Sequence, residues 1–238
     1  MGKKFKLFCF GFGQVAKYFV NNLLDKNSLS ELITTNTKKT ETKKINNFKY
    51  KSYFFSDNNF DIDLINDLQS SKKVLISIPP KNKNDLVLKN FGKYFKNKNF
   101  DWVTYLSATN VYGDKKGEWV NENTDPNPLS SKGKSRFVAE NEWLNFYKKF
   151  LLKIQIFRLS GIYSKENNII NKLQTGDYKI VEKKNNFFSR IHVEDISEIL
   201  TLSLNKFKPG EVYNISDNYP CSNEEVVTYA SQLLKINK

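Results

Sequence analysis

The chain is poor in the residues that build metal sites and disulfide frameworks. Its 238 residues include two cysteines, Cys9 and Cys221, and one histidine, His192. Two distant cysteines give neither a disulfide framework nor metal-ligand spacing, so we expect no metal site and exclude a zinc enzyme. No uncharged apolar run approaches the roughly 20 residues of a membrane-spanning helix. The apolar stretch near the N-terminus is short, and no small-residue cleavage site follows it. The sequence therefore predicts a soluble, cytoplasmic protein.

Arginine is also scarce, although the chain is basic. The 38 Lys and Arg residues exceed the 25 Asp and Glu residues by 13, yet only three are Arg. A nucleic-acid-binding surface favours Arg as well as Lys and interleaves aromatic side chains along one stripe, whereas these lysines are scattered. We interpret the charge mainly as compositional bias. Among the three functions that the sequence suggests, nucleic-acid binding ranks a distant third. Residues 1–100 carry 19 Lys and 8 acidic residues, so we expect an anionic ligand to bind this half.

The best-defined motif is a glycine-rich turn near the N-terminus. The apolar run Phe5–Phe10 has the length of a strand and precedes the turn Gly11–Ala16, after which Lys17–Leu24 has helical periodicity. A strand, a G-x-G-x-x-A turn and a helix in this order are typical of a dinucleotide-binding unit. Gly11 permits the tight turn, and Gly13 lets the backbone approach a pyrophosphate. The motif alone fits a tight turn without a ligand equally well.

Strands alternate with helices along the next part of the chain. Apolar runs of strand length occupy Glu31–Thr35, Tyr50–Phe55, Lys73–Ile78, Trp102–Leu106 and Leu152–Leu159, and helical patterns occupy Ile62–Leu68, Asp85–Phe95 and Gly133–Phe150. This alternation predicts an α/β fold, a doubly wound parallel sheet with the first strand near its centre and helices on both faces. Ligands of such sheets bind at the carboxyl ends of the strands.

Six segments occur in the order and spacing of a known family. They are Gly11–Ala16, Ser77–Pro80, Leu106–Gly113, Phe157–Tyr163, Ser189–Ile196 and Val212–Ile215. In these segments the chain resembles the extended short-chain dehydrogenase/reductases, also called the NAD-dependent epimerase/dehydratase family, and in particular their atypical, YeeZ-like branch. The resemblance runs from about Phe5 to Leu234.

The resemblance implies a division into two parts. Residues 1–160 would form a Rossmann-type domain that binds NAD or NADP. Residues 161–238 would form a small C-terminal lobe, interleaved with the last sheet elements, that usually holds a nucleotide sugar or a similar polar substrate. Family members usually continue for a few dozen residues beyond the last helix, so the resemblance also implies a short, truncated lobe.

The cofactor would contact the chain at several strand ends. The residues that we expect there are Gly11, Gly13, Gln14, Val15, Thr35, Asn36, Lys38, Ile78, Pro79 and Ser107. The segment Thr34–Lys39 lacks the acidic residue that binds the ribose 2′-hydroxyl in NAD-selective domains, while Lys38 or Lys39 is available for the 2′-phosphate of NADP. We therefore favour NADP slightly. A flexible basic loop that only reflects the composition fits this segment equally well.

The sequence departs from the family at the catalytic positions. Active members use a Ser or Thr three residues before the Val of the Val-Tyr-Gly motif and a Tyr-x-x-x-Lys pair at the start of the following helix. Ala108, Lys132 and Arg136 stand at these positions. The tyrosine normally transfers a proton, and such assistance contributes typically about 10²- to 10⁴-fold in rate. Two hypotheses stay open: an NAD(P)-binding protein without hydride chemistry, and an oxidoreductase or nucleotide-sugar epimerase that uses Lys132 or another unorthodox acid or base.

Two further sets of polar residues are candidates for the site. We expect Thr109, a hydroxyl residue next to Ala108, and Arg190 to contact the substrate. The segment of Arg190 faces the substrate lobe in relatives, and Arg offers a bidentate fork. A Ser-His-Asp hydrolase is disfavoured because no G-x-S-x-G motif is present. We instead expect His192 to pack at a junction between a strand and a helix, with Glu194 and Asp195 favoured at the helix N-terminus.

Overall fold

A nine-stranded sheet forms the centre of the computed structural model, which describes residues 3–96, 100–178 and 186–236. The strand β1 (Phe5–Phe10) lies between β2 (Leu29–Asn36) and β6 (Lys73–Ile76). Beyond β2 follow β4 (Phe48–Ser56) and β3 (Glu41–Ile45); beyond β6 follow β7 (Trp102–Ala108), β8 (Ile154–Leu159) and β12 (Val212–Ile215). All pairs in the described sheet are parallel except those of β3 and the short β5 (Asn59–Phe60) with β4. The predicted parallel sheet with β1 near its centre is confirmed.

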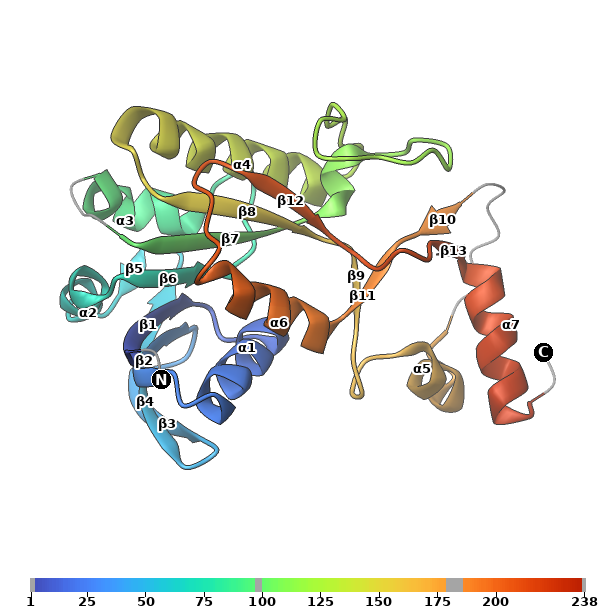
Figure 1. Cartoon of the computed structure of the whole chain (residues 1–238), viewed down its shortest axis with the longest axis horizontal. Helices are drawn as coiled ribbons and strands as arrows, with labels where there is room; N and C mark the ends of the chain where they lie inside the picture. Colours follow the sequence, from blue (N-terminus) through green and yellow to red (C-terminus); the bar gives the residue numbers. More distant parts are fainter. Residues whose placement is uncertain (1–2, 97–99, 179–185, 237–238) are drawn as a thin grey trace.

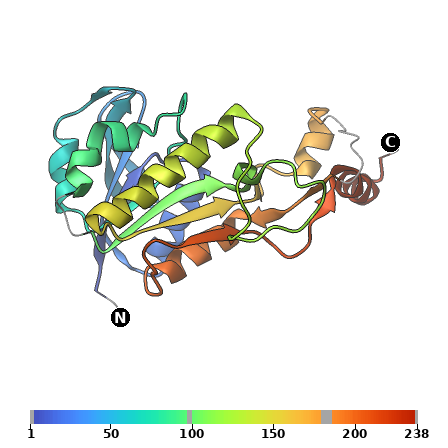
Figure 2. The same ribbon diagram turned by 90° about the horizontal axis from the view of Figure 1, so that it is seen from above.

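Helices cover both faces of this sheet (Figure 1). The helices α1 (Gln14–Asp25) and α6 (Val193–Ser203) lie side by side on one face. The helices α2 (Leu64–Ser70), α3 (Leu86–Lys96) and α4 (Ser131–Phe150) lie on the other, and Figure 2 shows α4 crossing over the strands. None of the helices in the described ranges combines the length and apolarity that a bilayer crossing requires.

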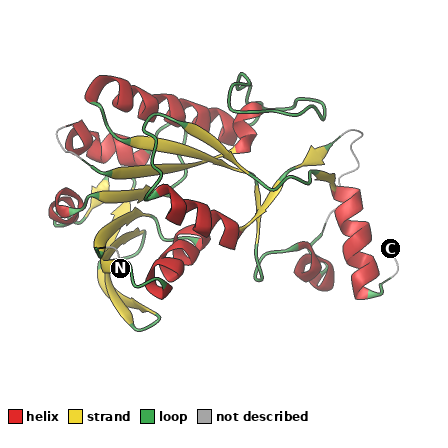
Figure 3. Ribbon diagram, in the orientation of Figure 1, coloured by secondary structure: helices red, strands yellow, loops and turns green. Residues whose placement is uncertain are grey.

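A small lobe lies beyond the carboxyl ends of the strands, at the right of Figure 1. It contains β9 (Gly161–Tyr163), α5 (Ile169–Thr175), β10 (Phe187–Phe188), β11 (Arg190–His192), β13 (Cys221–Ser222) and α7 (Asn223–Leu234). Figure 3 shows the long loop after β7 reaching toward the same end of the molecule. Because α6 and β12 return to the main sheet, elements of lobe and sheet alternate along the chain.

The strand β1 shows how the sequence builds two cores. Leu7 and Cys9 pack in the cluster beneath α1 and α6, whereas Phe8 and Phe10 pack in the cluster beneath α3 and α4. All four side chains are fully buried. Since side chains alternate across a strand, a continuous apolar run fills both cores, as is usual for a parallel strand that is covered on both faces.

A strand replaces the helix that usually connects neighbouring parallel strands. Between β2 and β4 the chain forms β3, which pairs antiparallel with β4 and places Lys43 opposite Tyr50. The sequence analysis missed β3, because Glu41–Ile45 is mostly charged. The adjacent residues Asn46 and Asn47 were a readable signal, because Asn is favoured in the two-residue turns of hairpins. In the structure both adopt the positive φ that such a turn requires, at 44° and 64°. Residues 37–47, all of which the structure describes, form no helix. The connection from β2 to β4 therefore adds no helix over the face of β4 next to α1.

Asp67 ties α2 to the sheet. One carboxylate oxygen accepts a hydrogen bond from the Tyr53 hydroxyl at 2.6 Å, and the other lies 2.7 Å from Lys6 Nζ. Burial alone would raise the pKa of Asp67, but the hydrogen bonds from Lys6 and Tyr53 hold this pKa below its ordinary value. The ionised carboxylate is therefore the form that stabilises the fold.

We expect Asp67→Asn to lower the free energy of unfolding at pH 7 by about 1–2 kcal/mol, because one charged partner of Lys6 is lost. The pKa of Asp67 is lower in the folded than in the unfolded chain, so its contribution is complete above an unfolded value of about 4 and is lost as the pH falls through the folded-state value. Urea unfolding from pH 7 down to pH 3 measures this difference. The exposed Asp63→Asn serves as control, and a difference that stays constant with pH would contradict the expectation.

Candidate functional site

The glycine turn connects β1 to α1 in a conformation that requires Gly11. Its φ is +83°, and an added Cβ would lie 2.9 Å from Ser77 Oγ and 3.0 Å from Ile78 Cγ1. The Gly11 N–H donates to Thr35 Oγ1 at 2.8 Å. A larger residue would therefore be strained and would displace the segment after β6, and Thr35 fixes the turn against the end of β2.

The first turn of α1 opens on a cavity. Gly13 is the N-cap residue, and the described residues provide no capping side chain and no acidic side chain in the first turn. A Cβ added to Gly13 would meet no described atom within 4 Å. The first N–H groups of a helix lack intrahelical partners and carry the positive end of the helix dipole, so they favour an anion in this space.

This cavity, which we call the turn cavity, has a volume of about 820 Å³. It is lined by the glycine turn, the ends of β2 and β4, part of β3 and the segment after β6. Six of the residues that we expected at the cofactor line it: Gly11, Gly13, Thr35, Asn36, Ile78 and Pro79. Residues that the sequence analysis selected after three separate strands therefore line one cavity.

The other expected cofactor residues do not line the turn cavity. Gln14 donates from Nε2 to Ser164 Oγ at 2.6 Å, which links α1 to the segment after β9. Val15 and Ser107 are buried, and Lys38 is exposed. The Ser107 hydroxyl, at the carboxyl end of β7, has no hydrogen-bond partner among the described residues.

Asn36 organises the turn that follows β2. Its side-chain oxygen accepts hydrogen bonds from the backbone N–H groups of Lys38 and Lys39 at 2.8 and 3.1 Å. Its amide nitrogen donates to Ser52 Oγ at 2.8 Å and to the Lys39 carbonyl at 2.8 Å. These bonds occupy the whole side chain, so Asn36 shapes the edge of the turn cavity through the backbone.

Three lysines that the sequence analysis missed also line the turn cavity: Lys17, Lys43 and Lys81. Lys17 lies four residues after Gly13, one helical turn along α1, and Lys43 comes from β3. The helical spacing from Gly13 was a readable signal for Lys17. Lys43 was not readable, because its position depends on the pairing of β3 with β4.

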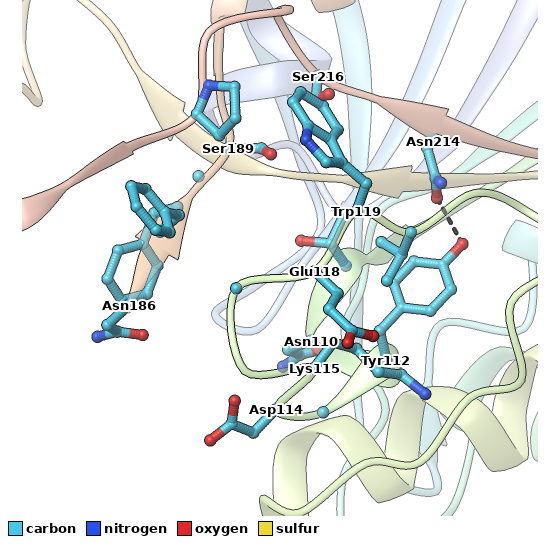
Figure 4. A pocket seen from close by; sticks show the side chains of 18 of the residues that line it. Asn110, Tyr112, Asp114, Lys115, Glu118, Trp119, Asn186, Ser189, Asn214 and Ser216 are labelled. Atoms are coloured by element: carbon cyan, nitrogen blue, oxygen red, sulfur yellow. Dashed lines mark hydrogen bonds between the residues drawn. The ribbon is translucent and has the colours of Figure 1, made fainter. Parts of the chain in front are cut away.

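A second cavity of about 880 Å³, which we call the lobe cavity, lies between the loop after β7 and the small lobe. Both expected substrate residues, Thr109 and Arg190, line it. Figure 4 shows polar side chains from both sides of this cavity, together with Trp119, which is 77% exposed. An aromatic surface among amides and hydroxyls suits a polar ligand that contains a planar ring.

The guanidinium of Arg190 already makes hydrogen bonds within the protein. Its guanidinium donates to the carbonyls of Phe188 and Cys221 at 3.0 and 3.3 Å and to Asn223 Oδ1 at 3.3 Å. These bonds tie β10, β13 and the start of α7 together. Arg190 therefore holds one wall of the lobe cavity in place.

A buried ion pair supports the opposite wall. Arg158, 5% exposed, donates from Nε and Nη2 to the carboxylate of Glu140, 1% exposed, with distances down to 2.8 Å. It also donates from Nη1 to the Tyr112 hydroxyl at 2.8 Å, and this hydroxyl donates to Asn214 Oδ1 at 2.8 Å (Figure 4). Burial disfavours the charge of Arg158, but Glu140 outweighs this effect and raises the pKa of Arg158. The sequence analysis quoted Arg158 within a motif and missed Glu140.

The three residues that we expect at the family's catalytic positions come from the carboxyl end of β7 and the start of α4. Ala108 ends β7, Lys132 is exposed in the first turn of α4, and Arg136 donates from Nη1 to the Leu106 carbonyl at 3.0 Å. Gly133 allows this close packing, because an added Cβ would lie 2.6 Å from the Asn110 carbonyl oxygen. None of the three is among the described residues that line the two cavities.

His192 lies at the junction that the sequence predicts. It is the N-cap residue of α6, its Nδ1 accepts a hydrogen bond from the Glu194 N–H at 3.4 Å, and its ring packs 5.1 Å from the ring of Tyr163. This structural role is confirmed. In the described ranges, no three His, Cys, Asp or Glu side chains gather as a metal site would require.

The strand order, with a glycine turn after the central strand, defines a dinucleotide-binding fold of the Rossmann type. Residues 11–216 match the model of the NAD dependent epimerase/dehydratase family. The chain belongs to this family. Its membership supports the expected binding of NAD(P), whereas the YeeZ-like branch stays a prediction.

Named relatives share part of the chain. The dTDP-D-glucose 4,6-dehydratases of Mus musculus and Homo sapiens are 25% and 26% identical over 145 residues, which are 56% of this chain and 39% and 40% of theirs. The match thus spans about two fifths of these relatives.

Solved structures share nearly the whole fold. A functionally unknown conserved protein from Silicibacter pomeroyi DSS has a TM-score of 0.82 and 28% identity, over 98% of this chain and 80% of that one. UDP-glucuronic acid 4-epimerase from Bacillus cereus, in complex with NAD, has a TM-score of 0.80 and 17% identity, over 98% and 85%. This last likeness concerns the fold alone.

Proposed function

We propose that this chain is an NAD(P)-binding protein whose turn cavity holds the dinucleotide, with the pyrophosphate at the first turn of α1. The observation that carries the proposal is the open helix N-terminus at Gly13, without a capping or acidic side chain among the described residues. Family membership supports it. The proposal assigns cofactor binding to residues 1–160 and the ligand-holding lobe to residues 161–238, and it includes a preference for NADP.

The residues present fit such a cofactor. The open space at Gly13 admits a phosphate, Thr35 holds the turn in shape, and Ile78 and Pro79 supply apolar walls. A bound nicotinamide cofactor would supply a carbon that donates or accepts hydride. The chain's own residues would bind the dinucleotide, orient it and exclude water from it.

The lobe cavity is the proposed site of a small polar ligand such as a nucleotide sugar. Thr109, Trp119 and Arg190 line it together with several amide side chains. The names of related proteins support this class: they include a dTDP-D-glucose dehydratase, and a UDP-glucuronic acid 4-epimerase solved with UDP-glucuronic acid and NAD.

We further propose that the usual Ser/Thr, Tyr and Lys proton transfer is absent. Ala108 carries no hydroxyl, Lys132 is exposed, and Arg136 is bonded to the Leu106 carbonyl. A second candidate function, an oxidoreductase or epimerase with an unorthodox acid or base, is favoured by one observation. The buried Ser107 hydroxyl, next to Ala108 in the sequence, has no partner among the described residues.

We expect little or no dehydrogenase or epimerase turnover with nucleotide sugars, because the groups that normally supply about 10²- to 10⁴-fold by proton transfer are replaced. Lys132→Ala is expected to leave both turnover and cofactor binding unchanged. Nicotinamide absorbance and chromatography of the sugar products measure turnover, and calorimetry measures cofactor binding.

The exposed Lys134→Ala provides a matched control for the Lys132 variant. Turnover that persists through purification, disappears in Lys132→Ala and survives in Lys134→Ala would contradict the proposal and identify Lys132 as the acid or base. Turnover that disappears in Ser107→Ala but survives in Lys132→Ala would also contradict the proposal, and it would identify Ser107 as the group that the second candidate function uses.

A further inference from the structure

The turn cavity is rich in lysine and poor in carboxylate. Lys17, Lys43 and Lys81 line it, and Asp57 is the only carboxylate residue among the described residues that do so. Asp57 is paired with Lys81 at 3.1 Å. The carboxylate that pairs with Lys43, Glu41 at 3.1 Å, does not line the cavity. The side chains that line the cavity therefore favour an anionic ligand.

The end of β2 offers no carboxylate to a ribose. Domains that select NAD place an acidic residue there, which binds the ribose 2′-hydroxyl and repels a 2′-phosphate. The residue at this end is Asn36, whose side chain is bonded to Ser52 and to the backbone of Lys38 and Lys39. Selectivity must therefore come from another element of the same cavity.

The strand β3 is that element. Lys43 lies opposite Tyr50 in the antiparallel register, and both residues line the turn cavity. Lys38 does not line it, although it is closer to Asn36 along the chain. The antiparallel register of β3 against β4 is therefore what brings Lys43 to the cavity.

We infer that Lys43 of β3 binds the 2′-phosphate of NADP and sets the preference for NADP over NAD, with Lys17 adding positive charge from α1. This inference rests on the proposed function. Glu41 pairs with Lys43 at 3.1 Å from two residues away on the same face of β3. Glu41 thus positions the Lys43 ammonium group and competes with a phosphate for it.

The test compares binding of NADPH, NADH, adenosine 2′,5′-bisphosphate and 5′-AMP by calorimetry at low and physiological salt. Wild-type protein is expected to bind NADPH more tightly than NADH. Lys43→Gln should weaken NADPH and adenosine 2′,5′-bisphosphate roughly tenfold, because one charge-assisted hydrogen bond is lost, and should leave NADH and 5′-AMP unchanged. Glu41→Gln should strengthen NADPH binding several-fold, because the competing carboxylate is removed.

Lys44→Gln is the matched control, since Lys44 is an exposed neighbour on the opposite face of β3. Lys43→Arg keeps the charge and should keep the preference, which separates binding from any loss of fold. Equal affinities of the wild type for NADPH and NADH, or equal effects of Lys43→Gln and Lys44→Gln, would overturn the inference. A selective loss in Lys38→Gln would overturn it in favour of the loop after β2. Failure to bind either dinucleotide would overturn the proposed function itself.

Discussion

Gly13→Asp is expected to abolish NAD(P) binding while the fold stays intact. Gly13 has an extended backbone conformation that any residue adopts, and an added Cβ meets no described atom within 4 Å. Asp is also a favourable N-cap residue, so the free energy of unfolding should change by only about a few tenths of a kcal/mol. The variant therefore isolates the effect of negative charge at the start of α1.

The expected loss of affinity is at least about 100-fold. Two unit charges about 4 Å apart interact by about 4 kcal/mol at an effective dielectric constant near 20, and each 1.4 kcal/mol corresponds to about tenfold in binding. Calorimetric titration with NADH and NADPH measures the loss, and thermal unfolding verifies the fold. Gly13→Asn is the matched control, because it caps the helix without a charge and should bind at least tenfold better than the Asp variant. Wild-type affinity in Gly13→Asp would contradict a pyrophosphate at this helix.

Glu140→Gln is expected to lower the free energy of unfolding by about 3–5 kcal/mol, because it leaves the buried guanidinium of Arg158 without a counter-charge. Both side chains are almost fully buried, and the carboxylate accepts hydrogen bonds from two guanidinium nitrogens. The effect should reach the lobe cavity, since Arg158 also holds the Tyr112 hydroxyl. Chemical denaturation of the wild type and the variant measures the difference.

Two further variants separate the missing counter-charge from general damage to α4. The exposed Glu142→Gln should change the free energy of unfolding by less than about 0.5 kcal/mol. The double variant Glu140→Leu/Arg158→Met should recover much of the lost stability, since a buried ion pair can often be replaced by apolar residues at little cost. A loss below about 1 kcal/mol in Glu140→Gln, or a double variant as unstable as the single one, would contradict this account.

Local sequence patterns determined most of the fold. The apolar run of β1, the glycine turn and the start of α1 follow one another within the chain, and the structure places them as the pattern predicts. The alternation of later strands and helices likewise predicted the parallel sheet, because each element has its own apolar pattern in the sequence. Apolar periodicity did not reveal β3, whose residues are mostly charged and whose pairing partner comes after it in the chain.

The candidate site divides in a similar way between sequence and tertiary structure. The sequence by itself determined the turn at Gly13, because this depends on spacing along the chain. For the same reason it predicts Ala108, Lys132 and Arg136 at the family's catalytic positions. Only the tertiary structure decided that Lys43 faces the turn cavity and that Glu140 neutralises Arg158. Such neighbours come from elements whose register and packing are set by the whole sheet, and spacing along the chain carries no record of that register.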